Sequence, residues 1–155
     1  MSDILLVDND PRIAELLAFF LKKRGHTVRT VKSFREARAA LAVREPDLML
    51  SDLDLGGERG DEELPKLSRE GLLPPTLVVS GYLDAATERA LGAIPAVLGT
   101  LRKPFDLSTL EARVQRALEE AARPRAAVAR PEAGLGETSN EDGWTDVAPF
   151  LGGTP

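Results

Sequence analysis

Polar side chains that can take part in phosphoryl chemistry follow short apolar runs at four places in this sequence. In chain order they are Asp8 with Asn9, Asp52, Ser80, and Lys103. Carboxylate and carbonyl oxygens are the ligands that Mg²⁺ prefers in proteins. A carboxylate can attack a phosphoryl group when the charge on the incoming phosphoryl group is neutralised. A lysine can supply the positive charge, and a hydroxyl can add a hydrogen bond. These residue types predict a phosphoryl-accepting site, provided that the fold gathers them.

The segments around these residues alternate between strand and helix patterns. Apolar or alternating runs predict strands at about residues 3–7, 26–31, 46–52, 76–80 and 96–101. Apolar residues at helical spacing predict helices that begin near residues 11, 34, 61, 84 and 108. This alternation implies a parallel sheet with helices on both faces. Because the carboxyl ends of parallel strands share one edge, the polar side chains are expected to meet there.

Local signals add detail to the helices. Ser33 with Glu36, and Ser108 with Glu111, form capping boxes that predict the starts of the second and fifth helices. In the first helix, the residues expected to face the core are Ile13, Leu16, Leu17, Phe20 and Leu21.

Composition excludes several classes of function. The chain has 155 residues, of which 43% are hydrophobic and 29% charged, so a core of ordinary size can form. It contains no Cys, which excludes disulfides and thiolate catalysis and fits a reducing compartment. The net charge of −5 argues against nonspecific binding to nucleic acid or to anionic membranes. Since no apolar stretch approaches the roughly 18 residues of a membrane span, we expect a cytoplasmic protein.

The character of the sequence changes near residue 123. Prolines and glycines punctuate a mainly acidic segment without sustained periodicity, which is typical of a flexible tail. We therefore expect one domain over residues 1–122 and a disordered tail over residues 123–155. A tail of this length is too short for a helix-turn-helix module, so we expect a stand-alone domain that does not bind DNA.

Four short motifs stand at the ends of the expected strands: Val7-Asp8-Asn9-Asp10-Pro11, Leu50-Ser51-Asp52-Leu53-Asp54, Val79-Ser80-Gly81-Tyr82 and Arg102-Lys103-Pro104-Phe105. In this order and at these intervals they resemble the receiver domain of two-component response regulators. The resemblance covers residues 1 to about 122. It implies a flavodoxin-like, three-layer fold with sheet order 2-1-3-4-5, and a signalling switch that acts by binding proteins rather than an enzyme with repeated turnover.

By position, Asp52 resembles the phosphoacceptor of this family, which takes phosphate from a histidine kinase or a histidine phosphotransfer protein. Asp8 and Asn9 match the pair that holds Mg²⁺ together with Asp52. The backbone carbonyl of Asp54 would complete the protein ligands of the metal.

The resemblance assigns roles to residues on the later strands as well. Ser80 matches the hydroxyl that turns toward the phosphoryl group, and Lys103 matches the site lysine, whose bond to Pro104 would be cis. Tyr82 and Asp54 match positions that influence how fast the phosphate is lost, although packing and solvation explain them equally well.

Two residues depart from the pattern. Asn9 stands where family members usually carry a second acid, so we expect weaker Mg²⁺ binding than at a two-acid site. Thr100 stands where receivers commonly place an aromatic ring that swings inward on phosphorylation, so the coupling to the fourth helix is expected to be weaker or differently built.

Other interpretations stay open at this point. Taken alone, Asp52 fits a residue that opens a turn equally well. Asn9 and Thr100 favour a degenerate receiver that binds partners without phosphorylation, whereas Asp52, Ser80 and Lys103 oppose it. The Asp52-Leu53-Asp54 motif also resembles haloacid-dehalogenase-type phosphatases, but those enzymes carry it on the first strand. The sequence does not name the kinase or the downstream target, and it is compatible with a weak homodimer.

Overall fold

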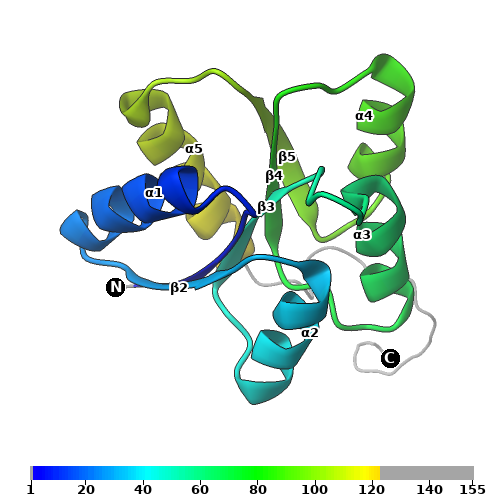
Figure 1. Cartoon of the computed structure of the whole chain (residues 1–155), viewed down its shortest axis with the longest axis horizontal. Helices are drawn as coiled ribbons and strands as arrows, with labels where there is room; N and C mark the ends of the chain where they lie inside the picture. Colours follow the sequence, from blue (N-terminus) through cyan, green and yellow to red (C-terminus); the bar gives the residue numbers. More distant parts are fainter. Residues whose placement is uncertain (1, 123–155) are drawn as a thin grey trace, which may run out of the picture. The chain divides into compact units, whose positions relative to one another are not determined.

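A computed structural model describes residues 2–122, which form a parallel sheet covered by helices on both faces (Figure 1). The strands are β1 (Asp3–Val7), β2 (Thr27–Val31), β3 (Leu48–Asp52), β4 (Thr76–Ser80) and β5 (Val97–Arg102). The helices are α1 (Pro11–Lys23), α2 (Phe34–Val43), α3 (Gly60–Arg69), α4 (Ala85–Gly92) and α5 (Leu107–Ala121). The strand order β2-β1-β3-β4-β5 confirms the predicted topology. The predicted tail, residues 123–155, lies outside the described residues.

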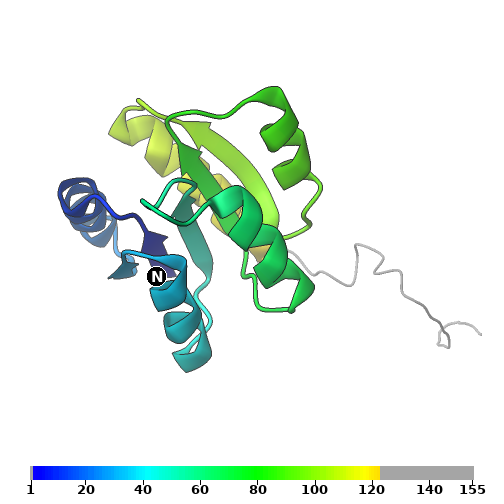
Figure 2. The same cartoon turned by 45° about the vertical axis from the view of Figure 1, so that its right-hand side comes forward.

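Two apolar cores, one on each face of the sheet, join the three layers (Figures 1 and 2). On one face, α1 and α5 bury Leu17 and Leu110 against the strands. On the other face, α2, α3 and α4 contribute the buried side chains of Phe34, Leu64 and Leu91. Because both faces are covered, the central strands β1, β3 and β4 read as nearly continuous apolar runs, whereas the outer strands β2 and β5 are only partly buried and β2 alternates. Within residues 2–122, no helix is long and apolar enough to cross a membrane.

The buried face of α1 differs from the predicted one. Leu16 was expected in the core, but it is 51% exposed. The buried stripe of the helix is Ala14, Leu17, Ala18 and Leu21. These residues have the spacing i, i+3, i+4, i+7, so the helix packs through a stripe that includes two small alanines. The large apolar side chains of Leu16 and Phe19 therefore point to solvent.

Only one of the two predicted capping boxes caps its helix as expected. At α2, the Ser33 hydroxyl accepts a hydrogen bond from the Glu36 N–H at 3.0 Å. At α5, the cap is Asp106 rather than Ser108, because the Asp106 carboxylate accepts the Thr109 N–H at 2.7 Å and its carbonyl accepts the Leu110 N–H at 3.1 Å. The hydrogen bonds from Thr109, and then that from Ser108, lower the pKa of the Asp106 carboxylate. Ser108 donates its hydroxyl to Asp106 instead.

This difference predicts unequal effects of removing the two serines. Ser33→Ala is expected to lower the free energy of unfolding by about 1 kcal/mol, because a helix N–H loses its acceptor. Ser108→Ala, the matched control, is expected to change it by less than about 0.5 kcal/mol. Urea unfolding of both variants measures this, and equal losses would contradict the capping assignment.

Candidate functional site

The sheet register places the carboxyl ends of four strands side by side. Val7 pairs with Ser51, Asp52 pairs with Val79, and Ser80 pairs with Arg102. The residues that follow these pairs form one edge, where the Lys103 N–H donates to the Ser80 carbonyl at 2.8 Å. The parallel topology therefore brings Asp8, Asp52, Ser80 and Lys103 together, as their positions after the strands predicted.

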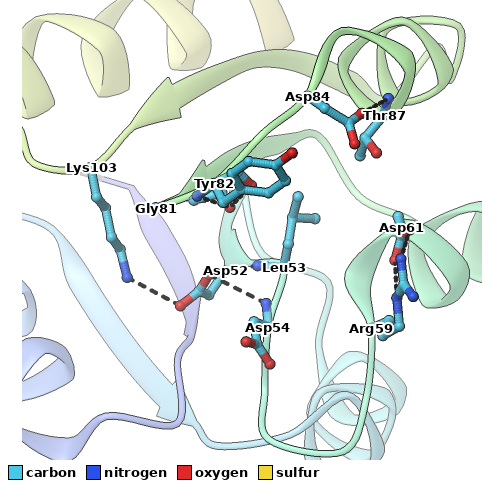
Figure 3. A pocket seen from close by; sticks show the side chains of 11 residues that line it. Asp52, Leu53, Asp54, Arg59, Asp61, Gly81, Tyr82, Asp84, Thr87 and Lys103 are labelled. Carbon is cyan, nitrogen blue, oxygen red and sulfur yellow. Dashed lines mark hydrogen bonds and ion pairs between the residues drawn. The ribbon is translucent and has the colours of Figure 1, made fainter.

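The centre of this edge is the Lys103 ammonium between two carboxylates. Lys103 Nζ lies 3.1 Å from Asp52 Oδ2, drawn in Figure 3, and 3.6 Å from Asp8 Oδ2. The Asp8 side chain is only 4% exposed and that of Asp52 13%. Burial by itself lowers the pKa of Lys103, but the hydrogen bond with Asp52 and the charges of Asp52 and Asp8 outweigh burial. The pKa of Lys103 therefore lies above its ordinary value of 10.5, and the side chain stays a cation.

The backbone after β3 orients the Asp52 carboxylate. Its Oδ1 atom accepts the Leu53 N–H at 2.7 Å and the Asp54 N–H at 3.4 Å. Its Oδ2 atom is the one that contacts Lys103. Asp52 is thus aligned between backbone donors and a cation.

The oxygens near Asp8 fit a hard dication. The Asp8 and Asp52 carboxylates converge on the same ammonium, so their oxygens already face one positive charge. Among residues 2–122, no three His, Cys, Asp or Glu side chains gather as metal ligands would. Amide and carbonyl oxygens are also of the kind that a hard dication accepts. The Asn9 amide is available, because Asn9 is exposed and lies beside Gly56, where an added Cβ would approach Asn9 Nδ2 to 3.1 Å.

Ser80 is buried at this edge, with 4% of its surface exposed. Its hydroxyl donates to the Tyr82 carbonyl at 2.7 Å and accepts the Tyr82 N–H at 3.3 Å. The hydroxyl is therefore held by the loop after β4. Tyr82 itself is 78% exposed. The Lys103–Pro104 peptide bond is cis, as the resemblance implies.

Thr100 does not reach this edge. Its hydroxyl donates to Glu88 Oε2 on α4 at 3.3 Å, and Arg102 donates to Glu88 Oε1 at 3.4 Å. Thr100 stands at the position where the family pattern has an aromatic ring, and here its hydrogen bond to Glu88 links β5 to α4. The sequence analysis did not identify Glu88, the partner of Thr100 on α4, as a functional residue.

A cavity of about 630 Å³ opens beside Asp52 (Figure 3). Its lining includes the predicted residues Asp52, Asp54, Ser80, Tyr82 and Lys103. It also includes residues that the sequence did not mark as part of the site: Arg59, Asp61, Asp84 and Thr87. Asp84 was visible in the sequence only as the start of a helix. Arg59 stands in the loop after β3, where neither spacing nor periodicity distinguishes it.

Comparison with known proteins agrees with this arrangement. The family profile described as the response regulator receiver domain matches residues 4–115. The chain belongs to the receiver domain family of response regulators. The motifs that carried the resemblance are therefore those of a receiver domain, and the predicted family is confirmed.

Similar proteins include longer regulators. NtrX of Azorhizobium caulinodans, a nitrogen assimilation regulatory protein, is 36% identical to this receiver domain over 120 residues, 76% of this chain and 26% of NtrX. The transcriptional regulatory protein TcrA of Mycobacterium tuberculosis is 36% identical over 112 residues, 72% of this chain and 44% of TcrA. The crystal structure of NtrX from Brucella abortus with ATP has a TM-score of 0.70 at 31% identity, covering 82% of this chain and 29% of that chain. This chain thus spans less than half the length of these relatives.

Proposed function

We propose that this receiver domain accepts a phosphoryl group on Asp52 from a phosphohistidine of a histidine kinase or a histidine phosphotransfer protein. The observation that supports this most is the Asp52 carboxylate, which is held by the Leu53 N–H, contacts Lys103 and borders the cavity. A nucleophile aligned in this way beside a cation needs little reorganisation before it attacks.

In the proposed step, a carboxylate oxygen of Asp52 forms a bond to phosphorus while the bond between phosphorus and the histidine nitrogen breaks. The leaving nitrogen keeps the electron pair, and solvent supplies its proton. Lys103 remains protonated and stabilises negative charge on the transferred oxygens. Attack of water on the acyl phosphate later releases inorganic phosphate and restores Asp52. The phosphoryl group stays on the protein, one per chain, until it is hydrolysed, so we infer a switch rather than a turnover enzyme.

We infer that Mg²⁺ assists this step. Asp8, Asp52, the side-chain oxygen of Asn9 and the backbone carbonyl of Asp54 would hold it, all of them oxygens of the kind that Mg²⁺ prefers. When bound, Mg²⁺ supplies positive charge beside the phosphoryl oxygens. The convergence of Asp8 and Asp52 on one ammonium supports this assignment.

Asn9→Asp is expected to tighten Mg²⁺ binding by roughly tenfold or more. A unit charge pair at 4 Å is worth about 4 kcal/mol at an effective dielectric of 20 before desolvation, and about 1.4 kcal/mol already corresponds to tenfold. Calorimetric titration of Mg²⁺ into the apo protein measures the change. Gln115→Glu, an exposed amide-to-acid change on α5, is the control and should leave the affinity unaltered. Equal affinities in wild type and Asn9→Asp would contradict the assignment of Asn9.

The proposed switch uses Ser80 and Lys103. The Ser80 hydroxyl would leave the Tyr82 carbonyl and bind the phosphoryl group, and the Lys103 ammonium would turn from the Asp52 carboxylate to the phosphoryl oxygens. Charge-assisted hydrogen bonds contribute about 1.5–3 kcal/mol each, and moving a conformer from 1:99 to 99:1 needs about 5.5 kcal/mol. Two such bonds are about sufficient. We infer that Thr100, through Glu88, passes the change to α4 in place of a ring.

Incubation of the protein with phosphoramidate and Mg²⁺, followed by mass measurement, tests this function. We expect one phosphoryl group per chain, stable in acid and labile in base, as an acyl phosphate is. Continuous release of phosphate with no phosphoryl group accumulating on the protein would indicate a phosphatase. No uptake would favour the alternative, a degenerate receiver that binds partners without phosphorylation.

The proposal also includes the location of the protein, the kind of partner that it contacts and the boundary of its domain. The absence of Cys and the net charge of −5 support a cytoplasmic protein that contacts other proteins rather than membranes or nucleic acid. The proposed domain boundary is near residue 122. NtrC of Salmonella typhimurium, 30% identical over 126 residues, is a DNA-binding transcriptional regulator of which this chain covers 26%.

A further inference from the structure

Arg59 stands opposite Asp54 in the loop that follows the phosphoacceptor strand. The Gly60 N–H donates to the Leu53 carbonyl at 2.6 Å, and the Leu55 N–H donates to the Glu58 carbonyl at 3.2 Å. Asp54 and Arg59 form the antiparallel bridge between these two hydrogen bonds. This is a non-hydrogen-bonded pair, the kind in which facing side chains lie closest.

This placement puts Arg59 diagonally across from Asp52. Asp52 and Asp54 lie two residues apart along the chain and line the same cavity. Diagonal neighbours of an antiparallel pair are about 7–8 Å apart, within the reach of a long side chain. Arg59 lines that cavity as well, and Figure 3 shows its side chain beside Asp61, across the cavity from the Asp52–Lys103 pair.

The present partner of Arg59 holds it weakly. The guanidinium donates to both carboxylate oxygens of Asp61, at 3.1 and 2.6 Å, but the Arg59 side chain is 68% exposed. Water competes for the Arg59 guanidinium, although Asp61 is only 25% exposed, so this pair contributes less than a fully buried pair would. The charge of Arg59 also acts across the cavity, since after the hydrogen bonds from Thr87 it helps to lower the pKa of Asp84.

The cavity is short of positive charge for an anionic ligand. Its lining carries four carboxylates, Asp52, Asp54, Asp61 and Asp84, but only two cations, Arg59 and Lys103. A phosphoryl group adds about 1.5 to 2 negative charges. The planar fork of arginine matches phosphate oxygens with two hydrogen bonds, so phosphate competes effectively with Asp61 for it.

We propose that Arg59 is a second phosphate-binding residue of this receiver. Its guanidinium breaks the contact with Asp61 and binds first the incoming phosphodonor and then the phosphoryl group on Asp52. This inference rests on the proposed phosphorylation of Asp52. Lys103 then neutralises charge at the carboxylate, and Arg59 does so from the opposite side of the cavity.

The rate of phosphorylation of the full chain by phosphoramidate with Mg²⁺, followed by mass measurement, tests the proposal. Arg59→Gln is expected to lower the rate roughly tenfold, with a larger effect at low salt, because electrostatic attraction of the donor is lost. Arg59→Lys should restore part of the rate. Arg69→Gln, the same charge change in the last turn of α3, should behave as wild type.

A second set of variants tests the exchange of partners. Asp61→Asn releases Arg59 and is expected to raise the rate, whereas Asp61→Asn combined with Arg59→Gln should be as slow as Arg59→Gln alone. An Arg59→Gln rate equal to wild type, or a gain from Asp61→Asn that persists without Arg59, would overturn the inference while phosphorylation itself stands. A wild-type protein that takes up no phosphate would overturn the proposed function and this inference together.

Discussion

Asp52→Asn is expected to abolish phosphate uptake while leaving the fold intact. An amide oxygen is not a nucleophile toward phosphorus under these conditions, whereas the shape of the side chain is unchanged. The amide oxygen can still accept the Leu53 N–H, and Lys103 keeps its contact with Asp8. The loss therefore has a chemical cause rather than a structural one. Mass measurement after phosphoramidate treatment, together with thermal unfolding, separates the two.

A matched control is available just before the other end of the same strand. Asp47 precedes β3 at the opposite edge of the sheet, where it accepts the Asp3 N–H, so Asp47→Asn should take up phosphate as wild type does. If Asp52→Asn still gained one phosphoryl group, the acceptor would be another residue, and the proposed role of Asp52 would be wrong.

Lys103→Ala is expected to slow phosphorylation by about 10² to 10³-fold, the loss typical of removing one stabilising donor from a transition state. It also leaves Asp8 and Asp52 facing each other without their shared cation. Lys103→Arg is expected to restore the rate only in part, because a planar guanidinium replaces the compact ammonium that fits between two carboxylates. Single-turnover phosphorylation rates measure both variants. Lys22→Ala, an exposed lysine at the end of α1, is the control.

The raised pKa of Lys103 predicts how the free energy of unfolding depends on pH. Its pKa is raised above 10.5 in the folded protein, so its contribution to stability is complete below pH 10.5 and is lost as the pH rises through the raised pKa. Thermal unfolding from pH 9 to 12 should show this alkaline decline in wild type. In Lys103→Ala the decline should be smaller, and an identical profile would mean that Lys103 gains nothing from its carboxylate partners.

Much of this site follows from sequence pattern. Asp8, Asp52 and Ser80 each end or directly follow an apolar strand, and Lys103 directly follows another, so any parallel arrangement delivers them to one edge. Continuous apolar runs located the central strands because these are buried on both faces, and alternation located the partly exposed β2. It was less informative for α1, where Leu16 and Leu17 are both apolar and only packing against the sheet decides which of them is buried.

Local chemistry was ambiguous at the helix starts. Ser108 and Asp106 can both cap α5, and the stronger acceptor, the Asp106 carboxylate, takes the N–H of Thr109. A motif search that stops at Ser-x-x-Glu does not weigh this competition. The cap that was predicted correctly, Ser33, has no carboxylate two residues before it.

The sequence by itself determined the order of strands and helices, the family, and the residue types that meet at the carboxyl edge of the sheet, because these depend on periodicity and on short motifs. Only the tertiary structure decided how those residues pair. Lys103 lies between Asp8 and Asp52, Ser80 is held by Tyr82, Thr100 is linked to Glu88, and Arg59 faces Asp54 across a loop. Such contacts join segments that are distant along the chain, and their geometry exists only once the strands are in register.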